Sequence, residues 1–364
     1  MKFLLALFLF ATLSAKAQSR LALTKSLDSI FQTLIKPDEP GAAVLLVKNN
    51  VIVYKKGFGL ADIKTKKRVT TKTLFNVGSI TKTFVAYGIL ELARDGKLSL
   101  EDDLYKYFPD FKNKKIAKKV KLYHLLTHSS GIPDNRQVDK DSIFYLTAKD
   151  PENFAPLKQT EKLNFEPGEQ FEYSNPAFNG LALIIEKISG KKWQQYITET
   201  IYRPSGMKHS TITDGPHPET GVAHGYILDE QKEFIEKDYG EEPTFAAAGN
   251  GGVWSSVEEL WKYEQAIQKN IFLDSSWINK SRRVYPLDNW KDKQPSFMGL
   301  SWFLSKQGDL DVIGHTGSQG GFNADYVWLP QKKIFYVLLC NTPKPIRDLR
   351  SHVFELLKGN NWLN

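Results

Sequence analysis

Apolar residues recur every three or four positions over residues 23–34, which places them on one face of a helix, and Pro37 ends this helix. Two runs rich in aliphatic residues follow at 43–47 and 51–54, separated by Lys-Asn-Asn at 48–50. Asparagine tolerates positive φ, which tight hairpin turns require. We therefore expect the two runs to form a β-hairpin.

The rest of the chain alternates between helical and strand-like patterns. A second helix is expected from about residue 79 to 94, because Gly96 then follows as a cap. From 97 to 245, short helical segments alternate with Pro- and Gly-rich loops without a regular strand pattern, and the Lys-rich stretch 112–121 is expected to be a solvated loop. Strand-like runs return at 310–313, 323–329 and 334–339, and an amphipathic helix over 346–357 closes the sequence.

Strands and helices at both ends, with a helical and looped middle, define the expected fold class. We expect an α/β (α+β) fold, in which one antiparallel sheet is built from both ends and covered by the terminal helices. The sheet domain is then discontinuous, over 18–96 and 246–364, and a mostly helical insertion domain occupies 97–245.

Residues 1–17 have the pattern of a secretory signal peptide. Lys2 supplies a positive start, residues 3–13 are apolar, and Ala-Lys-Ala at 15–17 suits cleavage. The apolar run is too short for a spanning helix, and no cysteine follows to carry a lipid. We expect export to the periplasm or the cell exterior without stable membrane insertion. An uncleaved signal that acts as an anchor is the alternative.

Composition excludes several classes of protein. The 364 residues are 41% apolar and 25% charged, unlike a disordered chain or a collagen-like fibre. The net charge is +8, but basic residues alternate with acidic ones, so no nucleic-acid partner is expected. Cys340 is the single cysteine and cannot form an internal disulfide or a Cys-rich metal site. His124 and His128 have the spacing of zinc ligands, but position 125 lacks the glutamate of a metalloprotease, so we expect no metal and no other cofactor.

Candidate chemistry begins with a serine that is followed three residues later by lysine. This pattern starts at positions 79, 189 and 205, so it carries little information alone. Only Ser79 opens an amphipathic helix, where it lies one turn from Lys82 on the same face. The helix N-terminus favours negative charge on the serine oxygen, and a neutral lysine amine accepts its proton. The alternative is a serine helix cap beside a surface lysine.

Two further polar clusters follow along the chain. Tyr173 and Asn175 lie two residues apart in a loop of the helical insertion. The other cluster, at the end of a predicted strand, comprises His315, Thr316, Gly317 and Ser318.

In this order the three clusters resemble the catalytic motifs of the serine β-lactamase and penicillin-binding-protein superfamily. The strongest likeness is to its branch of class C β-lactamases, D-Ala-D-Ala carboxypeptidases and esterases. LLTHSSGIP at 125–133 is similar to the family's LLTHTSGLP, FEPG at 165–168 leads into Tyr-x-Asn, and 248–256 resembles a glycine-rich family segment. The resemblance covers essentially the whole chain after residue 17, and a set of motifs outweighs the helix-cap interpretation.

The resemblance implies a role for each site residue. Ser79 is the implied nucleophile that forms an acyl-enzyme, and Lys82 and Tyr173 share its proton. A tyrosine of ordinary pKa, about 10, is a poor base at neutral pH and needs the lysine beside it. Asn175 is implied to hold Lys82 and the amide oxygen of the substrate. The backbone N–H groups of Ser79 and Ser318 form the implied oxyanion hole.

His315 departs from the classical β-lactamases, which have lysine there to bind the substrate carboxylate. A histidine of ordinary pKa is mostly neutral at neutral pH and attracts an anion less, although Thr316 can still donate to a carboxylate. The change argues against strong β-lactamase activity, not against hydrolysis. Glu166 and Glu169 precede Tyr173 in a Pro-Gly turn, and we interpret them as structural instead of as the deacylating base.

The expected function is that of an exported serine hydrolase acting through an acyl-enzyme. Small amides ending in D-amino acids and simple esters are equally supported as substrates. The alternative is a non-catalytic protein of the same fold that binds penicillin or peptidoglycan peptides. Intact Ser79, Lys82 and Tyr173 argue against it, because binding needs no paired nucleophile and base. The leaving group and the oligomeric state do not follow from the sequence.

Overall fold

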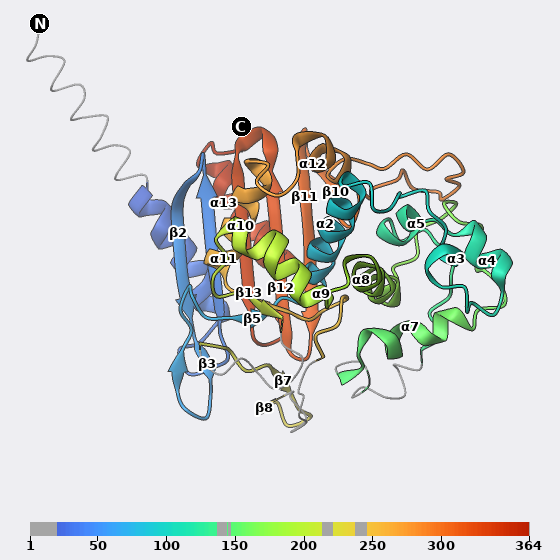
Figure 1. The fold of residues 1–364 in the computed structure, drawn as a ribbon. Helices are drawn as coiled ribbons and strands as arrows, with labels where there is room; N and C mark the ends of the chain where they lie inside the picture. The colour runs from blue at the N-terminus through green and yellow to red at the C-terminus, as the bar shows by residue number, and fades with distance from the viewer. Residues whose placement is uncertain (1–19, 137–143, 145–146, 213–220, 237–245, 364) are drawn as a thin grey trace, which may run out of the picture.

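The computed structural model describes residues 20–136, 144, 147–212, 221–236 and 246–363, so the predicted signal peptide lies outside the described residues. A six-stranded sheet in the order β10-β11-β12-β13-β1-β2 dominates the fold, and every neighbouring pair of strands is antiparallel (Figure 1). Its strands are β1 (Ala42–Lys48), β2 (Val51–Phe58), β10 (Phe303–Gln307), β11 (Leu310–Gln319), β12 (Phe322–Leu329) and β13 (Ile334–Cys340). The first and last of these pair directly, with Ala42 opposite Cys340, which confirms a sheet built from both ends of the chain.

Both faces of the central strands are covered, which explains their nearly continuous apolar sequences. Alternate residues of β1 point to opposite faces. Val44 and Leu46 pack under the helix over residues 20–34 and under α13 (Ile346–Gly359). Leu45 and Val47 face the larger core, which includes α2 (Thr81–Arg94) and α11 (Val257–Gln268).

The predicted hairpin between β1 and β2 is confirmed. Asn49 and Asn50 have φ of 50° and 62°, so both turn residues are left-handed, as the twist of the adjoining strands favours. The energetic cost of this conformation is lower for asparagine than for most residues with a side chain. The hairpin therefore follows directly from its two turn residues.

α2 is the central helix between the sheet and the helical part of the molecule (Figure 1). Only Ala93 and Arg94 of its residues are not buried. Phe84 stacks on Tyr263 of α11 at 4.1 Å, and a Cβ at Gly88 would lie 2.8 Å from a methyl group of Ile197. This close packing fixes the position of α2 against its neighbours. The helical part comprises α3 (Leu104–Tyr107), α4 (Lys114–Lys119), α5 (Leu122–Leu126), α7 (Asp150–Lys158), α8 (Asn175–Ser189), α9 (Trp193–Ile197), the π-helix η2 (Thr198–Tyr202) and α10 (Arg203–Ser205).

Two expectations for the middle of the chain are wrong. The Lys-rich stretch contains α4 instead of a loop, because the Asn113 side chain caps it and Ile116 and Ala117 are buried, although the lysines of α4 are exposed as expected.

Short strands also occur where none was predicted, since segments of two or three residues are too short to show a period of two. The remaining strands are β3 (Leu60–Asp62), β4 (Lys67–Arg68), β5 (Phe75–Asn76), β6 (Thr211–Ile212), β7 (Tyr226–Leu228), β8 (Phe234–Glu236) and β9 (Val253–Ser255), and α12 (Ser275–Ser281) and the 3₁₀ helix η3 (Pro330–Lys332) complete the fold.

None of the helices in the described ranges has the length and apolar character needed to cross a bilayer.

Candidate active site

Ser79 lies where the chain turns from β5 into α2 through η1, a 3₁₀ helix (Gly78–Ile80). The Gly78 N–H donates to the Asn76 side chain at 2.8 Å, and Gly78 has φ of +52°, which favours glycine. Ser79 is half-buried at the head of α2 and lines a cavity. The predicted helix start is therefore correct to within two residues.

Lys82 is fully buried one turn further along. Its Nζ lies 3.0 Å from Ser79 Oγ and 2.7 Å from the carbonyl oxygen of Asn250. Burial lowers the pKa of Lys82 well below its ordinary value, and the positive charge of Arg136 lowers it further. When protonated, the amine donates to both Ser79 Oγ and the Asn250 carbonyl oxygen. In the unprotonated form, which the lowered pKa favours, it keeps the hydrogen bond to Asn250 and offers its lone pair to the Ser79 O–H. This arrangement activates the hydroxyl as a nucleophile.

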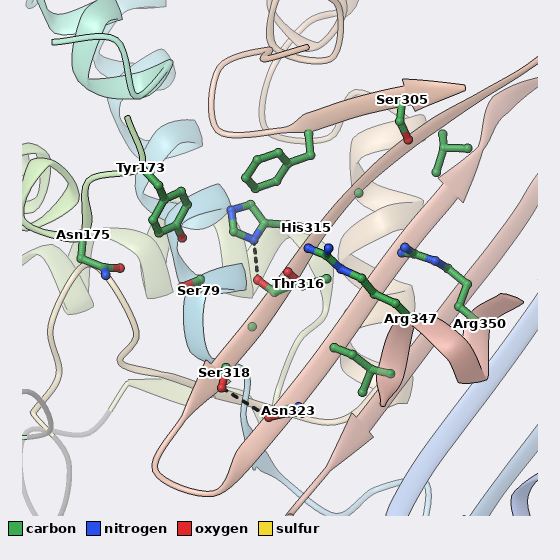
Figure 2. A pocket seen from close by; sticks show the side chains of 15 residues that line it. Ser79, Tyr173, Asn175, Ser305, His315, Thr316, Ser318, Asn323, Arg347 and Arg350 are labelled. Carbon is green, nitrogen blue, oxygen red and sulfur yellow. Dashed lines mark hydrogen bonds between the residues drawn. The ribbon is translucent and has the colours of Figure 1, made fainter. Parts of the chain in front are cut away.

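Tyr173 reaches the same place from the loop before α8. The centroid of its ring lies 5.2 Å from Lys82 Nζ, 4.3 Å from the ring of His128 and 6.3 Å from the ring of Phe303. Figure 2 shows the phenol beside Ser79 at one end of the cavity. The structure thus brings a hydroxyl, an amine and a phenol from two distant segments together.

Asn175 begins α8, after Ser174 caps the helix by accepting from the Ala177 N–H. The implied hydrogen bond from Lys82 to Asn175 is not formed. Asn175 Oδ1 is buried without a hydrogen-bond partner in the part of the chain that the structure describes. The Asn250 carbonyl accepts from Lys82 instead, and it belongs to a backbone segment whose approach no motif spacing reveals. Asn175 still lines the cavity, so its role toward the substrate stays a prediction.

β11 passes close against η1 because two glycines leave room. A Cβ at Gly78 would lie 2.7 Å from the Ser318 nitrogen. A Cβ at Gly317 would overlap the carbonyl oxygen of Val77 and lie 3.2 Å from the Ser79 nitrogen. Side chains at either position would force the two segments apart. The backbone nitrogens of Ser79 and Ser318, the predicted oxyanion hole, are therefore brought to one edge of the cavity.

His315 and Thr316 project from β11 beside these residues (Figure 2). His315 is buried against Phe303, and its Nδ1–H donates to the Thr316 carbonyl oxygen at 2.6 Å. Burial, reinforced by the nearby Lys82, lowers the pKa of His315 to about 3. The imidazole is therefore neutral over the whole range in which enzymes usually act, as the sequence predicts.

The cavity has a volume of about 650 Å³ and extends along β11 to the start of α13. Arg347 and Arg350 of α13 line it on the side away from Tyr173 and Asn175 (Figure 2). Arg350 donates to the buried Asp325 at 2.8 Å, whereas Arg347 is exposed and forms no ion pair with a described residue. Sequence reasoning missed both arginines, because their segment shows only the pattern of an amphipathic helix. Their spacing of three residues, which places both on the same face of a helix, is the signal that could have indicated them.

Glu166 and Glu169 form ion pairs with Lys119 and Lys291 and do not line the cavity. Their interpretation as structural residues agrees with these contacts. Within the described residues, no three His, Cys, Asp or Glu side chains gather as a metal site requires.

The chain is similar to known proteins over most of its length. Residues 27–358 match the Beta-lactamase family. The chain belongs to this family. Among its curated relatives, penicillin-binding protein 4* of Bacillus subtilis (strain 168) is 28% identical over 314 residues, which are 82% of this chain and 67% of the relative. The chain spans about two thirds of the length of the curated relatives that it matches.

Solved structures that are similar to this chain have the same fold. The octameric penicillin-binding protein homologue from Pyrococcus abyssi is 28% identical, with a TM-score of 0.78 over 95% of this chain and 77% of that chain. D-amino acid amidase from Ochrobactrum anthropi SV3, complexed with L-phenylalanine amide, has a TM-score of 0.77 at 21% identity, over 93% and 99% of the two chains. The predicted β-lactamase/transpeptidase-like fold is confirmed, whereas the class C-related branch within the family stays a prediction.

Proposed function

We propose that this member of the Beta-lactamase family is an exported serine hydrolase that forms an acyl-enzyme on Ser79. The observation that carries the proposal is the 3.0 Å separation between Ser79 Oγ and Lys82 Nζ, at the edge of a cavity large enough for a small substrate. Burial lowers the pKa of this amine well below its ordinary value, which favours the unprotonated form that takes the proton of the hydroxyl.

The first half of the reaction forms the acyl-enzyme. Ser79 Oγ attacks the carbonyl carbon of an amide or ester while its proton passes to Lys82 Nζ. The backbone N–H groups of Ser79 and Ser318 stabilise the oxyanion of the tetrahedral intermediate. The bond to the leaving group then breaks, and Tyr173, in proton exchange with Lys82, protonates the departing nitrogen or oxygen. In the second half, water repeats these steps on the ester and restores the Ser79 hydroxyl.

The charge along the cavity supports a substrate with a carboxylate. His315 is neutral, so the lysine charge of the classical β-lactamases is missing beside the nucleophile. Arg347 and Arg350 supply positive charge further along the cavity. Guanidinium groups bind carboxylates through two parallel hydrogen bonds. Peptides that end in a D-amino acid carry such a group, whereas simple esters do not, so we favour the peptides.

A covalent-labelling experiment tests the proposed function. A fluorescent penicillin and a fluorophosphonate should each add covalently to the wild-type protein, with one molecule of reagent per chain. Ser79→Ala should take up neither reagent. Ser189→Ala is the matched control, because Ser189 begins the same Ser-x-x-Lys pattern but forms hydrogen bonds with the backbone of Lys191 instead of with the lysine side chain of the pattern. A wild type that binds penicillin reversibly without an adduct would show the non-catalytic alternative to be correct.

Arg347→Ala should raise KM for a D-Ala-D-Ala peptide about 3- to 10-fold and leave kcat unchanged. A hydrogen bond to a charged group contributes about 1.5–3 kcal/mol, and exposure reduces this value. Arg347 is the informative position, because removing Arg350 would also leave the buried Asp325 without its partner. Steady-state kinetics with the peptide and with an uncharged p-nitrophenyl ester provide the comparison. An equal rise in KM for both substrates would contradict a carboxylate contact.

A further inference from the structure

His128 occupies an unusual position two residues after the end of α5. It is 1% exposed and has φ of +54°, a left-handed conformation that costs energy for a residue with a side chain. Backbone strain of this kind persists only where the surroundings hold it in place. Here the surroundings are the segment that carries Tyr173, because the Ser129 carbonyl also accepts from the Gly168 N–H at 2.7 Å.

Three contacts of His128 bracket Tyr173. The His128 carbonyl oxygen accepts from the Glu172 N–H at 2.8 Å, and its Nδ1 accepts from the Ser174 N–H at 3.0 Å. Between these two hydrogen bonds, the imidazole stacks on the Tyr173 ring with centroids 4.3 Å apart and an interplanar angle of 25°. The residue before Tyr173, the residue after it and its ring are therefore all held by one histidine.

The protonation of His128 is determined by these contacts. Because Nδ1 accepts a hydrogen bond, the ring proton resides on Nε2, which is buried without a partner among the described residues. Burial lowers the pKa of His128 well below its ordinary value, and Lys82 and His315 lower it further. A protonated Nδ1 would lose the hydrogen bond from Ser174.

We propose that His128 is a positioning residue, which aligns the Tyr173 phenol with Lys82 and Ser79 through its ring face and its Nδ1 lone pair. This inference rests on the proposed function, since it assigns a purpose to the position of a catalytic phenol. Proton transfer requires close approach of the reacting atoms, and a displacement of about 1 Å costs on the order of 10²-fold in rate. The backbone contact of His128 survives substitution, so the effect of the side chain is separable from it.

Two substitutions at His128 remove one side-chain contact each. His128→Asn keeps an acceptor near the Nδ1 position and tolerates positive φ, but it removes the stacked ring. His128→Phe keeps a ring and removes the acceptor. We expect each to lower the limiting rate of acylation by the fluorescent penicillin about 10- to 100-fold, with the half-saturating concentration changed less than about 2-fold.

His124→Asn is the matched control. His124 is also buried, and its Nδ1 also accepts a backbone N–H, that of Lys121 at 2.9 Å, but its ring packs on Tyr123 instead of Tyr173. This variant should lower the melting temperature without changing the limiting acylation rate. Thermal unfolding of all variants separates loss of fold from loss of alignment.

A double-mutant cycle with Tyr173→Phe distinguishes positioning from general stabilisation. If His128 acts through the phenol, His128→Asn should cost less than about 2-fold in a Tyr173→Phe protein, whose phenol oxygen is already absent. Equal effects in the two backgrounds would overturn the inference and leave the proposed function intact. A wild type that forms no adduct would overturn the proposed function first.

Discussion

Lys82→Arg should reduce the rate at which Ser79 is acylated by about 10²–10⁴-fold, the range that a general base contributes. A guanidinium stays protonated at every accessible pH and cannot accept the Ser79 proton. The charge would also be buried, at a position where burial already lowers the pKa of the lysine well below its ordinary value. The measurement is the second-order rate of acylation by a fluorescent penicillin.

Folding of the Lys82 variants needs its own control. Lys82→Met has a similar volume and no charge, so it should fold and yet be acylated as slowly as Lys82→Arg. Lys192→Met, which changes the exposed lysine of another Ser-x-x-Lys sequence, should leave the rate unchanged. Acylation of Lys82→Met at more than about a tenth of the wild-type rate would show that another group accepts the proton.

The pH dependence of the wild type follows from the same amine. Because burial lowers the pKa of Lys82 well below its ordinary value, more of the amine is unprotonated at a given pH than in an exposed lysine. Acylation should be lost as the pH falls through this lowered pKa, since the protonated amine has no lone pair to offer.

The strands of the large sheet other than β10 could be predicted from the sequence because their signals are local. Asn49 and Asn50 favour the left-handed conformation that the hairpin turn requires. The apolar runs at both ends of the chain indicate strands that are covered on both faces. The helix α4 in the Lys-rich stretch could not be predicted. It depends on one asparagine cap and two buried residues, which give too weak a pattern. The short strands beside Ser79 depend on pairing between distant segments, as in Phe75 with Ser255.

The site also has features that the sequence predicts and features that it does not. The order of the motifs led to the correct prediction that Ser79, Lys82 and Tyr173 meet, although nothing in their spacing requires it. The second partner of Lys82 is a backbone carbonyl at Asn250, and any residue type presents one, so no side-chain pattern identifies it. The sequence marks His128 as part of LLTHSSGIP and as a possible zinc ligand, but it does not indicate the role beside Tyr173. The contacts that define this role join residues 45 and 46 positions apart.

Gly317→Ala should lower the acylation rate by about 10²–10³-fold, the cost of removing one oxyanion-hole donor. The new methyl group would overlap the Val77 carbonyl oxygen and press against the Ser79 nitrogen, which lies 3.2 Å from the Cβ position. β11 must then move away from η1, and the backbone nitrogens of Ser79 and Ser318 separate. The Ser79–Lys82 pair lies within η1 and α2, so it should stay intact.

This geometry leads to a specific combination of results for Gly317→Ala. The protein should remain folded, keep its reactive serine, and lose the ability to stabilise a tetrahedral oxyanion. A boronic acid that adds to Ser79 mimics that intermediate, so its affinity should fall in parallel with the acylation rate. Gly359→Ala, at a position where a Cβ meets no atom within 4 Å, is the control and should change neither quantity. If Gly317→Ala binds the boronic acid with wild-type affinity, the backbone nitrogens of Ser79 and Ser318 are not the oxyanion donors. The close approach of β11 to η1 would then serve packing alone.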